Sequence, residues 1–338
     1  MKQEDFWYIV AEGHELKKNQ VISRSILGEW LAVFRDDAGK VSVLQDKCLH
    51  RTAQISRGKV TNGQLQCPYH GWTYNQTGEV TAIPSMGESF KPGSKCAKTY
   101  EVIEQEDYIY VRLASGSHET RPFSMPCYKA PGYTTIRLQN VFKNNVTNCA
   151  ENFVDIPHTT FVHPKIFRDA KHEKFGAHIL REEGRVKVTY KNEKKNFGWF
   201  SWFLNPTGEE IGHTDEFFVP NITSVHYRFS GQNHFIITSQ SIPINDEETL
   251  VYTDLTYNYG IWTRFSRPLV RWQAQTIIDQ DVEILNNQMK TIKKYGAHFQ
   301  NSPADIIHTW IESIQSEVAQ GRDPKLLPRK ETEIEFWV

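Results

Sequence analysis

Cys48-Leu49-His50 and Cys67-Pro68-Tyr69-His70 stand 16 residues apart in this chain of 338 residues. Each segment offers one thiolate and one imidazole, and the turn-forming pair Asn62-Gly63 lies between them. Two short loops of this kind can close over a small inorganic centre, each supplying one sulfur and one nitrogen ligand. The pattern therefore predicts a metal site made by two cysteines and two histidines.

The order of the ligands indicates which metal centre this is. Zinc sites usually pair cysteine with cysteine and histidine with histidine, whereas here each arm runs from Cys to His. One Cys and one His per arm is typical of a Rieske [2Fe–2S] cluster, in which two cysteines hold one iron and two histidines hold the other. A structural zinc site is the alternative interpretation.

The sequence around this motif alternates short apolar runs with turns. Asp36–Gly39, Asn62-Gly63 and Thr77-Gly78 are typical hairpin connections. They separate runs that we expect to be strands, at residues 30–34, 41–44, 64–66, 72–74, 79–83 and 108–113. A stretch rich in Gly, Ser and Pro follows at 115–132. We therefore expect an all-β domain at 1–118 and a second domain at 119–338.

The second half mixes helices and strands. Its patterns predict a helical segment at 147–163, a long helix at about 266–294 and a shorter helix at about 303–319. The strands that we expect there span 183–191, 197–204, 222–230, 234–242 and 249–258. Strands followed by a long C-terminal helix favour an α+β fold, with an antiparallel sheet around that helix.

Composition excludes several classes of protein. With 39 basic and 40 acidic residues, the chain lacks the basic surplus that a nucleic-acid binder uses against phosphates. It has no apolar run near 18 residues, so we expect no membrane span, and charges within Met1–Val10 argue against a signal peptide. Five cysteines are too few for a disulfide scaffold. We therefore expect a cytoplasmic protein.

A second group of metal-ligand residues begins at Asn152. At 100° per residue, Asp155, His158 and His163 fall within about 140° of one helix face. Pro157 cannot sit inside a helix, so we expect a kink or break there. A triad of two histidines and one carboxylate can hold a non-haem iron and leave positions open for O2 and substrate. His158 and His163 would supply the two nitrogen ligands, so one more oxygen ligand is needed.

The long helix offers three carboxylates as that ligand. Helical spacing places Asp279 and Glu283 on its polar face and Asp281 in the middle of an apolar face. That face comprises Ile277, Ile278, Ile284, Leu285 and Gln288. A carboxylate on an apolar face must be paired or bound to metal, because an unpaired buried charge is very costly. Asp281 is therefore the predicted third ligand.

The Rieske motif followed about 80 residues later by Asp-x2-His-x4-His resembles the Rieske non-haem iron oxygenases, specifically their catalytic α-type subunit. The resemblance covers essentially the whole chain. It implies an N-terminal Rieske domain and a C-terminal catalytic domain of the helix-grip (START-like) class. It also implies that a mononuclear Fe(II) is held by His158, His163 and Asp281, and that the cluster is held by Cys48, Cys67, His50 and His70.

The resemblance assigns roles to two further residues. Asp155 corresponds to the aspartate that links a cluster histidine of the neighbouring subunit, here His70, to an iron ligand. Asn152 corresponds to a pocket asparagine near the iron. Within one chain of this family the two sites are too far apart for fast electron transfer, so the resemblance implies a head-to-tail homotrimer.

The activity implied by the resemblance is that of a terminal oxygenase. It uses O2 and electrons from a separate flavin reductase, with or without a ferredoxin, to hydroxylate or demethylate a small aromatic or heterocyclic substrate. The chain has no glycine fingerprint for a dinucleotide, which places the reductase on another protein. The pattern is closest to the demethylase and monooxygenase branch. Alternatives are a ring cis-dihydroxylating α subunit, which Glu151-Asn152-Phe153 resembles, and a Rieske electron carrier without oxygenase activity.

The expected strand at 197–204 is unusually aromatic. A period of two sends Phe197, Trp199 and Phe203 to one face and Phe200 and Trp202 to the other. One face either lines a substrate cavity or belongs to the core or a subunit interface, and the pattern leaves both interpretations open.

Overall fold

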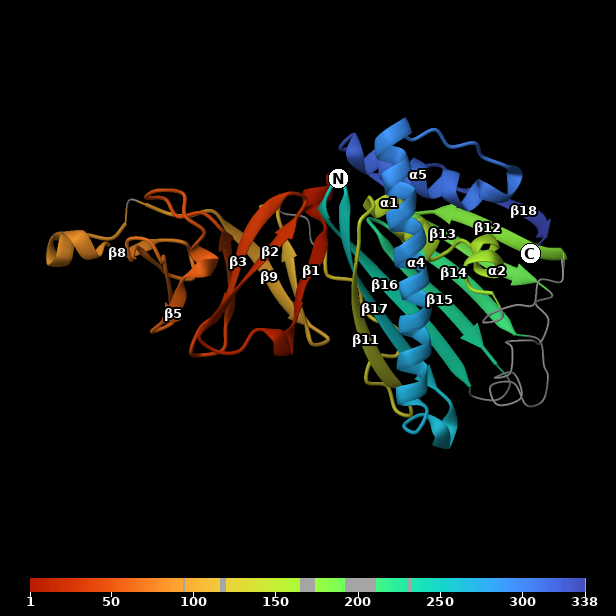
Figure 1. Cartoon of the computed structure of the whole chain (residues 1–338), viewed down its shortest axis with the longest axis horizontal. Helices are drawn as coiled ribbons and strands as arrows, with labels where there is room; N and C mark the ends of the chain where they lie inside the picture. The colour runs from red at the N-terminus through yellow and green to blue at the C-terminus, as the bar shows by residue number, and fades with distance from the viewer. Residues whose placement is uncertain (94, 116–119, 165–173, 192–210, 230–232, 338) are drawn as a thin grey trace. The chain divides into compact units, whose positions relative to one another are not determined.

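The computed structural model describes residues 1–93, 95–115, 120–164, 174–191, 211–229 and 233–337. The chain divides into two compact units (Figure 1). The N-terminal unit is Glu4–Ser124, and the C-terminal unit is Met125–Val338 together with Met1–Gln3. The expected strand at 197–204 and its aromatic residues lie outside the described residues.

The N-terminal unit is all-β in its described part. One antiparallel sheet has the strand order β1-β10-β9-β4-β3-β2 and a smaller one has the order β5-β6-β7-β8. The strands are β1 (Trp7–Glu12), β2 (Gln20–Ile26), β3 (Glu29–Arg35), β4 (Val41–Gln45), β5 (Lys59–Thr61), β6 (Gln64–Gln66), β7 (Thr73–Tyr74), β8 (Val80–Ala82), β9 (Thr99–Gln105) and β10 (Tyr108–Arg112).

Turn chemistry and burial explain this arrangement. Asn62 and Gly63 both have positive φ, at 50° and 71°, which is the geometry of the tight turn that joins β5 to β6. Cys48 and Cys67 belong to a buried cluster with Phe34 and Tyr74. The cysteines are thus held by the core of this unit, and all the strands predicted around the motif are confirmed.

The C-terminal unit is built on an eight-stranded antiparallel sheet, with the order β11-β17-β16-β15-β14-β13-β12-β18. Its strands are β11 (Thr134–Phe142), β12 (Lys174–Glu182), β13 (Arg185–Lys191), β14 (Gly212–Phe218), β15 (Ile222–Arg228), β16 (His234–Asn245), β17 (Glu248–Asn258) and β18 (Lys330–Trp337). The expected strands at 183–191, 222–230, 234–242 and 249–258 are present as β13, β15, β16 and β17.

The sequence did not reveal four strands of this sheet, namely β11, β12, β14 and β18. β18 lies at the sheet edge and reads Lys-Glu-Thr-Glu-Ile-Glu, which matches the charged composition that protects edge strands from unwanted pairing. β14 carries His213 and Asp215 at its buried positions, where apolar residues are normally expected. In both strands, polar residues occupy positions where the prediction relied on apolar residues alternating with polar ones.

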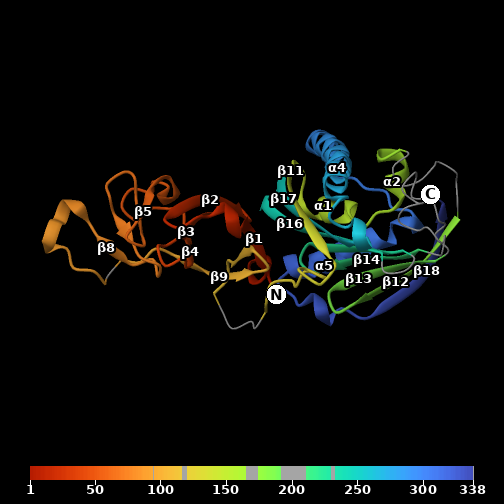
Figure 2. The ribbon, with the colours of Figure 1, turned by 90° about the horizontal axis from the view of Figure 1, so that it is seen from below.

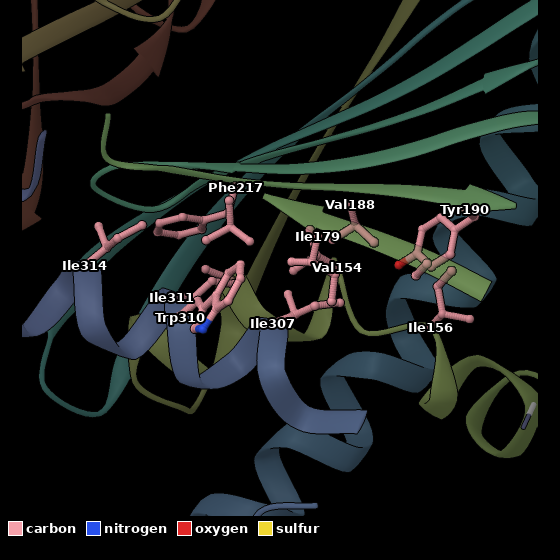
Figure 3. Close-up of a cluster of buried hydrophobic side chains, with 13 residues drawn as sticks. Val154, Ile156, Ile179, Val188, Tyr190, Phe217, Ile307, Trp310, Ile311 and Ile314 are labelled. Atoms are coloured by element: carbon pink, nitrogen blue, oxygen red, sulfur yellow. The ribbon is translucent and has the colours of Figure 1, made fainter. Parts of the chain in front are cut away.

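Helix α4 (Arg267–Tyr295) crosses one face of the sheet in Figure 1 and is seen end-on, standing off that face, in Figure 2. Its buried stripe is Ile278, Asp281, Leu285 and Met289, and Ile278 and Leu285 pack into a cluster with β11 and β17 residues. Helix α5 (Ile306–Ala319) buries Trp310 among the side chains of β12 to β14 (Figure 3). The α+β fold with a sheet packed on a long helix is therefore confirmed.

The predicted helical segment at 147–163 is divided. Helix α1 (Val146–Asn152) begins at Asn145, whose side chain accepts a hydrogen bond from the Asn148 N–H, and α2 (Pro157–Val162) begins at Pro157. The break expected at this proline is thus real, because proline is tolerated only in the first turn of a helix. His163 lies just past the end of α2, so the three residues 155, 158 and 163 do not share one continuous helix. In the described part of the chain, no helix combines the length and apolarity that crossing a membrane requires.

Candidate metal centres and substrate cavity

The two cysteine loops of the N-terminal unit repeat one hydrogen-bond pattern. The N–H of Cys48 donates to the carbonyl of Ala53, and the N–H of Cys67 donates to the carbonyl of Trp72, both at 2.8 Å. Each loop therefore closes onto the residue five positions after its cysteine. This equivalence of the two arms is what the paired Cys-to-His motif predicts, and it places one thiol and one imidazole on each side.

The loops also share a backbone conformation at the fourth residue after the cysteine. Thr52 and Gly71 have φ of 55° and 73°, and their N–H groups donate back to the carbonyls of Cys48 and Cys67. At Gly71 a Cβ would lie 2.8 Å from the Pro84 ring, so glycine is required there by space as well as by φ.

Both thiols are buried and receive hydrogen bonds. Tyr74 Oη lies 3.2 Å from Cys48 Sγ and accepts the Leu49 N–H at 3.0 Å, so its own hydrogen is available to the sulfur. Burial raises the pKa of the Cys67 thiol, while the N–H groups of Tyr69 and His70 oppose that shift. Such hydrogen bonds to sulfur are one of the means by which proteins set the potential of an iron–sulfur cluster.

The two imidazoles of this motif lie side by side. The His50 and His70 ring centroids are 4.5 Å apart, and Trp72 stacks on His50 at 5.0 Å. His50 Nδ1 is buried and has no hydrogen-bond partner in the described part of the chain. Burial, with the nearby His70 and Arg51, lowers the pKa of His50 and keeps its ring neutral, as a metal ligand must be. Two thiols, two imidazoles and a buried nitrogen without a partner fit a [2Fe–2S] cluster.

The second group of ligands forms within the C-terminal unit. His158 lies on α2, His163 directly after it, and Asp281 in the middle of α4. One ligand atom from each lies within 4.8 Å of the other two. Asp281 Oδ1 is 3.1 Å from His163 Nε2 and 3.6 Å from His158 Nε2. The structure therefore brings together the three residues that the sequence singled out.

The orientation of these side chains fits a metal ion. Asp281 is only 4% exposed, and its Oδ1, which both imidazoles face, has no hydrogen-bond partner among the described residues. The Nδ1 atoms are engaged elsewhere: His158 Nδ1 lies 3.3 Å from Asp155 Oδ2, and His163 Nδ1 lies 2.8 Å from Gln280 Oε1. Hydrogen bonds at Nδ1 leave the Nε2 lone pairs free, which is the usual way that proteins orient metal-binding histidines.

Proton affinities at the site reflect the same geometry. Burial disfavours the charged form of His158, but Asp155 and Asp281 outweigh it and raise the pKa of His158 to about 9. Burial works against ionisation of Asp281 too, yet His158 and His163 bring the net pKa of Asp281 below its ordinary value. A divalent cation held by the same three side chains would replace the imidazole protons as the positive charge beside Asp281.

The neighbours of the triad explain why Asp281 differs from the other two candidates. Asp279 and Glu283 are exposed on the opposite side of α4, as the helical spacing predicted, whereas Asp281 is buried. One member assigned to the apolar face was wrong: Ile284 is 44% exposed, because that edge of α4 faces away from the sheet. Gln280 was not singled out, and only its adjacency to Asp281 could have suggested it.

Asp155 and Asn152 both lie at the triad. Val154 and Ile156 are buried in the core cluster of Figure 3, which fixes Asp155 between them beside His158. Asn152 Nδ2 is buried with no hydrogen-bond partner in the described part of the chain, and the residue lines the same cavity as the triad. An N–H donor is thus available close to the metal position.

A cavity of about 470 Å³ connects the triad with the space between α4 and the sheet. That volume suits a small organic molecule. Its described lining is mainly apolar and aromatic, and includes Phe153, Val225, Tyr227, Phe235, Ile237, Leu255, Tyr259, Trp262, Val270 and Ile278. The acidic side chains among the described lining residues are Asp155, Asp215 and Asp281, and the same lining residues include no lysine or arginine. The arrangement places a metal at the wall of an apolar chamber.

Comparison with known families agrees with both sites. Residues 6–101 match the Rieske [2Fe-2S] domain, and residues 142–307 match the Vanillate O-demethylase oxygenase C-terminal domain. The chain belongs to the Rieske non-haem iron oxygenases. The cofactors of such a protein are a Rieske [2Fe–2S] cluster and a mononuclear non-haem iron.

Relatives of this Rieske oxygenase include Protein TIC 55, chloroplastic, of Arabidopsis thaliana, which is 23% identical over 333 residues, 94% of this chain and 58% of the relative. The oxygenase component of dicamba O-demethylase of Stenotrophomonas maltophilia is 28% identical over 188 residues, 55% of either chain. The matches thus span less than two thirds of these relatives. The crystal structure of dicamba monooxygenase with 3,6-dichlorosalicylic acid shares the fold, with a TM-score of 0.82 at 21% identity over 94% of this chain and 97% of that one.

Proposed function

We propose that this chain is a terminal oxygenase component that hydroxylates or oxidatively demethylates a small aromatic or heterocyclic substrate, using O2 and electrons from a separate reductase. The observation that carries the proposal is the His158, His163 and Asp281 triad at the wall of the apolar cavity. An electron carrier needs no second metal site and no substrate chamber. The dicamba relative, itself an oxygenase component, supports the same class of activity.

The proposed ligand sets follow from the chemistry of the donors. Cys48 and Cys67 would hold one cluster iron, and His50 and His70 the other. His158, His163 and Asp281 would hold the mononuclear iron and leave positions open beside the cavity. When bound, the two metal groups supply electrons and the activation of O2.

The protein's own side chains perform the remaining work. Aromatic and aliphatic residues of the cavity exclude water and hold the substrate against the triad. Gln280 and Asp155 fix the two imidazole rings through their Nδ1 atoms. The buried amide of Asn152 positions a polar group of the substrate, because a donor without a partner gains most when the substrate provides one.

Asp155 is also the proposed route for electrons from a neighbouring subunit. Its side chain is 38% exposed while it contacts the proposed ligand His158. In the N-terminal unit, His70 is exposed, and so can meet a partner. A head-to-tail homotrimer would place His70 of one subunit against Asp155 of the next, since heterologous interfaces of this kind close into rings.

The partners complete the proposal. A flavin reductase, with or without a ferredoxin, would deliver electrons to the cluster in the cytoplasm. Supplying the purified protein with a surrogate reductase, NADH and O2 tests the function directly. Formation of a hydroxylated or demethylated product from an aryl ether or N-methyl heterocycle is the expected result. Cluster reduction without any O2-dependent product, in a protein that carries iron at the triad, would instead favour the electron carrier.

A further inference from the structure

Asp215 is a buried carboxylate in the cavity wall that the metal site does not use. It lies on β14, is 2% exposed, and lines the chamber that also contains the triad. In the sheet register Asp215 stands opposite Val225, which pairs with Ile237 and then Leu255. Asp215 therefore interrupts an apolar row, which Val188 continues on its other side, and the free-energy cost of burying a charge there is large unless it is paired.

The side chain of Asp215 is held in place from behind. Tyr190 Oη donates to its Oδ2 at 3.0 Å, and His213 Nε2 lies 2.8 Å from its Oδ1. The His213 ring is itself stacked between Tyr190 and Tyr227, at centroid distances of 4.5 and 4.2 Å. Three aromatic rings on adjacent strands thus fix the carboxylate against the chamber.

This arrangement leaves acceptor capacity on the carboxylate. Each oxygen of an ionised carboxyl group can accept about two hydrogen bonds, and each oxygen of Asp215 has one partner in the described part of the chain. Tyr190 and His213, the two partners of the carboxylate, are not among the described lining residues of the chamber, so a further donor can approach Asp215 from the cavity. A hydrogen-bond donor on the substrate would use the remaining acceptor capacity of Asp215.

The charges of the chamber point to the chemistry of that donor. Asp281 is assigned to the metal and Asp155 contacts His158, which leaves Asp215 as the one acid of the described lining without a role. No lysine or arginine of the described lining could bind an anion. A carboxylate placed at Asp215 would therefore meet repulsion, whereas a protonated amine or another N–H donor would meet an acceptor that is already oriented.

We infer that Asp215 is a specificity-determining residue that binds a cationic or N–H-bearing group of the substrate, with His213 and Tyr190 as its positioning residues. The apolar body of the substrate then lies along Val225 and Ile237, and its reacting carbon lies at the triad. This inference rests on the proposed function, since it assigns the substrate class of the same chamber.

Binding of two matched probes tests the inference. The holoprotein is titrated calorimetrically, without O2 or reductant, with para-methoxybenzylamine and with para-methoxybenzoate, which differ only in the charged group. We expect the amine to bind about tenfold or more tightly than the benzoate, and Asp215→Asn to remove about tenfold of that preference, as hydrogen bonds to charged groups typically contribute. Tyr190→Phe should have a smaller effect of the same sign.

Glu216→Gln is the matched control. Glu216 is the next residue of β14, points to the opposite face and pairs with Arg185, so its loss should leave the amine preference unchanged. The visible spectrum of the cluster and the thermal unfolding midpoint report whether each variant is folded. If Asp215→Asn does not fold, the preference of the wild-type protein decides the matter alone.

Equal affinities for amine and benzoate, tighter binding of the benzoate, or binding of neither probe would overturn the inference. So would an amine preference that persists in folded Asp215→Asn. Because no turnover is involved, these results are independent of the oxygenase proposal. A protein that demethylates an aryl ether yet shows no amine preference would lose only the substrate class, whereas one that shows the preference without O2-dependent chemistry would lose only the oxygenase function.

Discussion

The two proposed metal sites of this protein are built in opposite ways. The cluster site draws all its residues from two neighbouring loops, between Cys48 and His70, and each loop is closed by its own backbone hydrogen bonds. The iron site exists only after α2 and α4 have packed, because Asp281 comes from a distant helix. The first site is thus local and the second depends on tertiary structure, so substitutions should separate the two.

Loss of the distant ligand should have the largest effect. Asp281→Ala removes the carboxylate that faces both imidazoles, so we expect loss of the mononuclear iron and of product formation, while the visible spectrum of the cluster persists. Iron analysis and turnover with a surrogate reductase measure both. Glu283→Ala, an exposed change on the same helix, is the control and should behave as wild type. Product formation by Asp281→Ala would refute the ligand assignment.

Asp155→Asn tests whether electrons pass from the cluster to the mononuclear iron through that residue. The amide keeps the size of the side chain but removes its charge, so both kinds of iron should remain bound. We expect oxidation of the pre-reduced cluster in a single turnover to slow by roughly 100-fold, the upper range for groups that support metal ligands. Rapid-mixing spectroscopy follows the cluster directly. Oxidation at the wild-type rate would show that electrons take another route.

Gln280→Leu tests whether a residue outside the three proposed ligands supports the iron site. Gln280 Oε1 accepts from His163 Nδ1 at 2.8 Å, and a leucine cannot fix that ring. The affinity for Fe(II) should fall about 10- to 100-fold while the cluster is unchanged. Metal titration of the iron-depleted protein measures it, with Gln273→Leu, also on α4, as the control. An unchanged affinity would mean that packing alone orients His163.

The sheet that carries the cavity should also respond to pH. Burial, with His226 and Arg228, lowers the pKa of His234 to about 4. As pH falls below about 6.5, His234 binds a proton in the unfolded chain but not in the folded protein. The free energy of unfolding therefore declines down to about pH 4 and not further. We expect His234 to contribute about 1 kcal/mol of this decline, allowing for its partial exposure to water.

His234→Gln should therefore weaken the pH dependence of the unfolding midpoint between about pH 7.5 and about pH 5, relative to wild type. His14→Gln, an exposed histidine of the N-terminal unit, should leave it unchanged. Equal pH dependence in wild type and His234→Gln would exclude His234 as a source of acid sensitivity.

The smallest effect is expected within the cluster loops. Tyr74→Phe removes the hydroxyl 3.2 Å from Cys48 Sγ. Since that hydrogen bond favours the more negative, reduced cluster, its loss should lower the reduction potential by roughly 40 mV, the equivalent of about 1 kcal/mol for one electron. Redox titration measures it, with Tyr69→Phe as the exposed control. A raised potential would contradict this role of the hydroxyl.

The same contrast explains what could be predicted from the sequence. The cluster motif could be recognised in the sequence because its ligands and the turns that position them lie close together along the chain. Asp281 could be found because a carboxylate on an apolar helix face is an exception to the pattern of that helix. In both cases a local rule of periodicity or turn chemistry sufficed.

Other features depend on contacts that no local pattern encodes. Gln280 matters because its side chain accepts a hydrogen bond from His163, which lies just past the end of α2, and Asp215 matters because its strand places it in the cavity wall. The strand β14 was missed since its buried polar residues are compensated by partners elsewhere, such as Tyr190 for Asp215. The division of the expected helix at 147–163 was foreseen from Pro157, but the non-helical position of His163 was not.

The measurement that tests the account most directly is the iron and acid-labile sulfide content of the anaerobically purified protein. A Rieske cluster and an occupied triad together predict about three irons and about two sulfides per chain. About two irons with two sulfides, unchanged after supplementation with Fe(II), would contradict the second metal site and with it the oxygenase function.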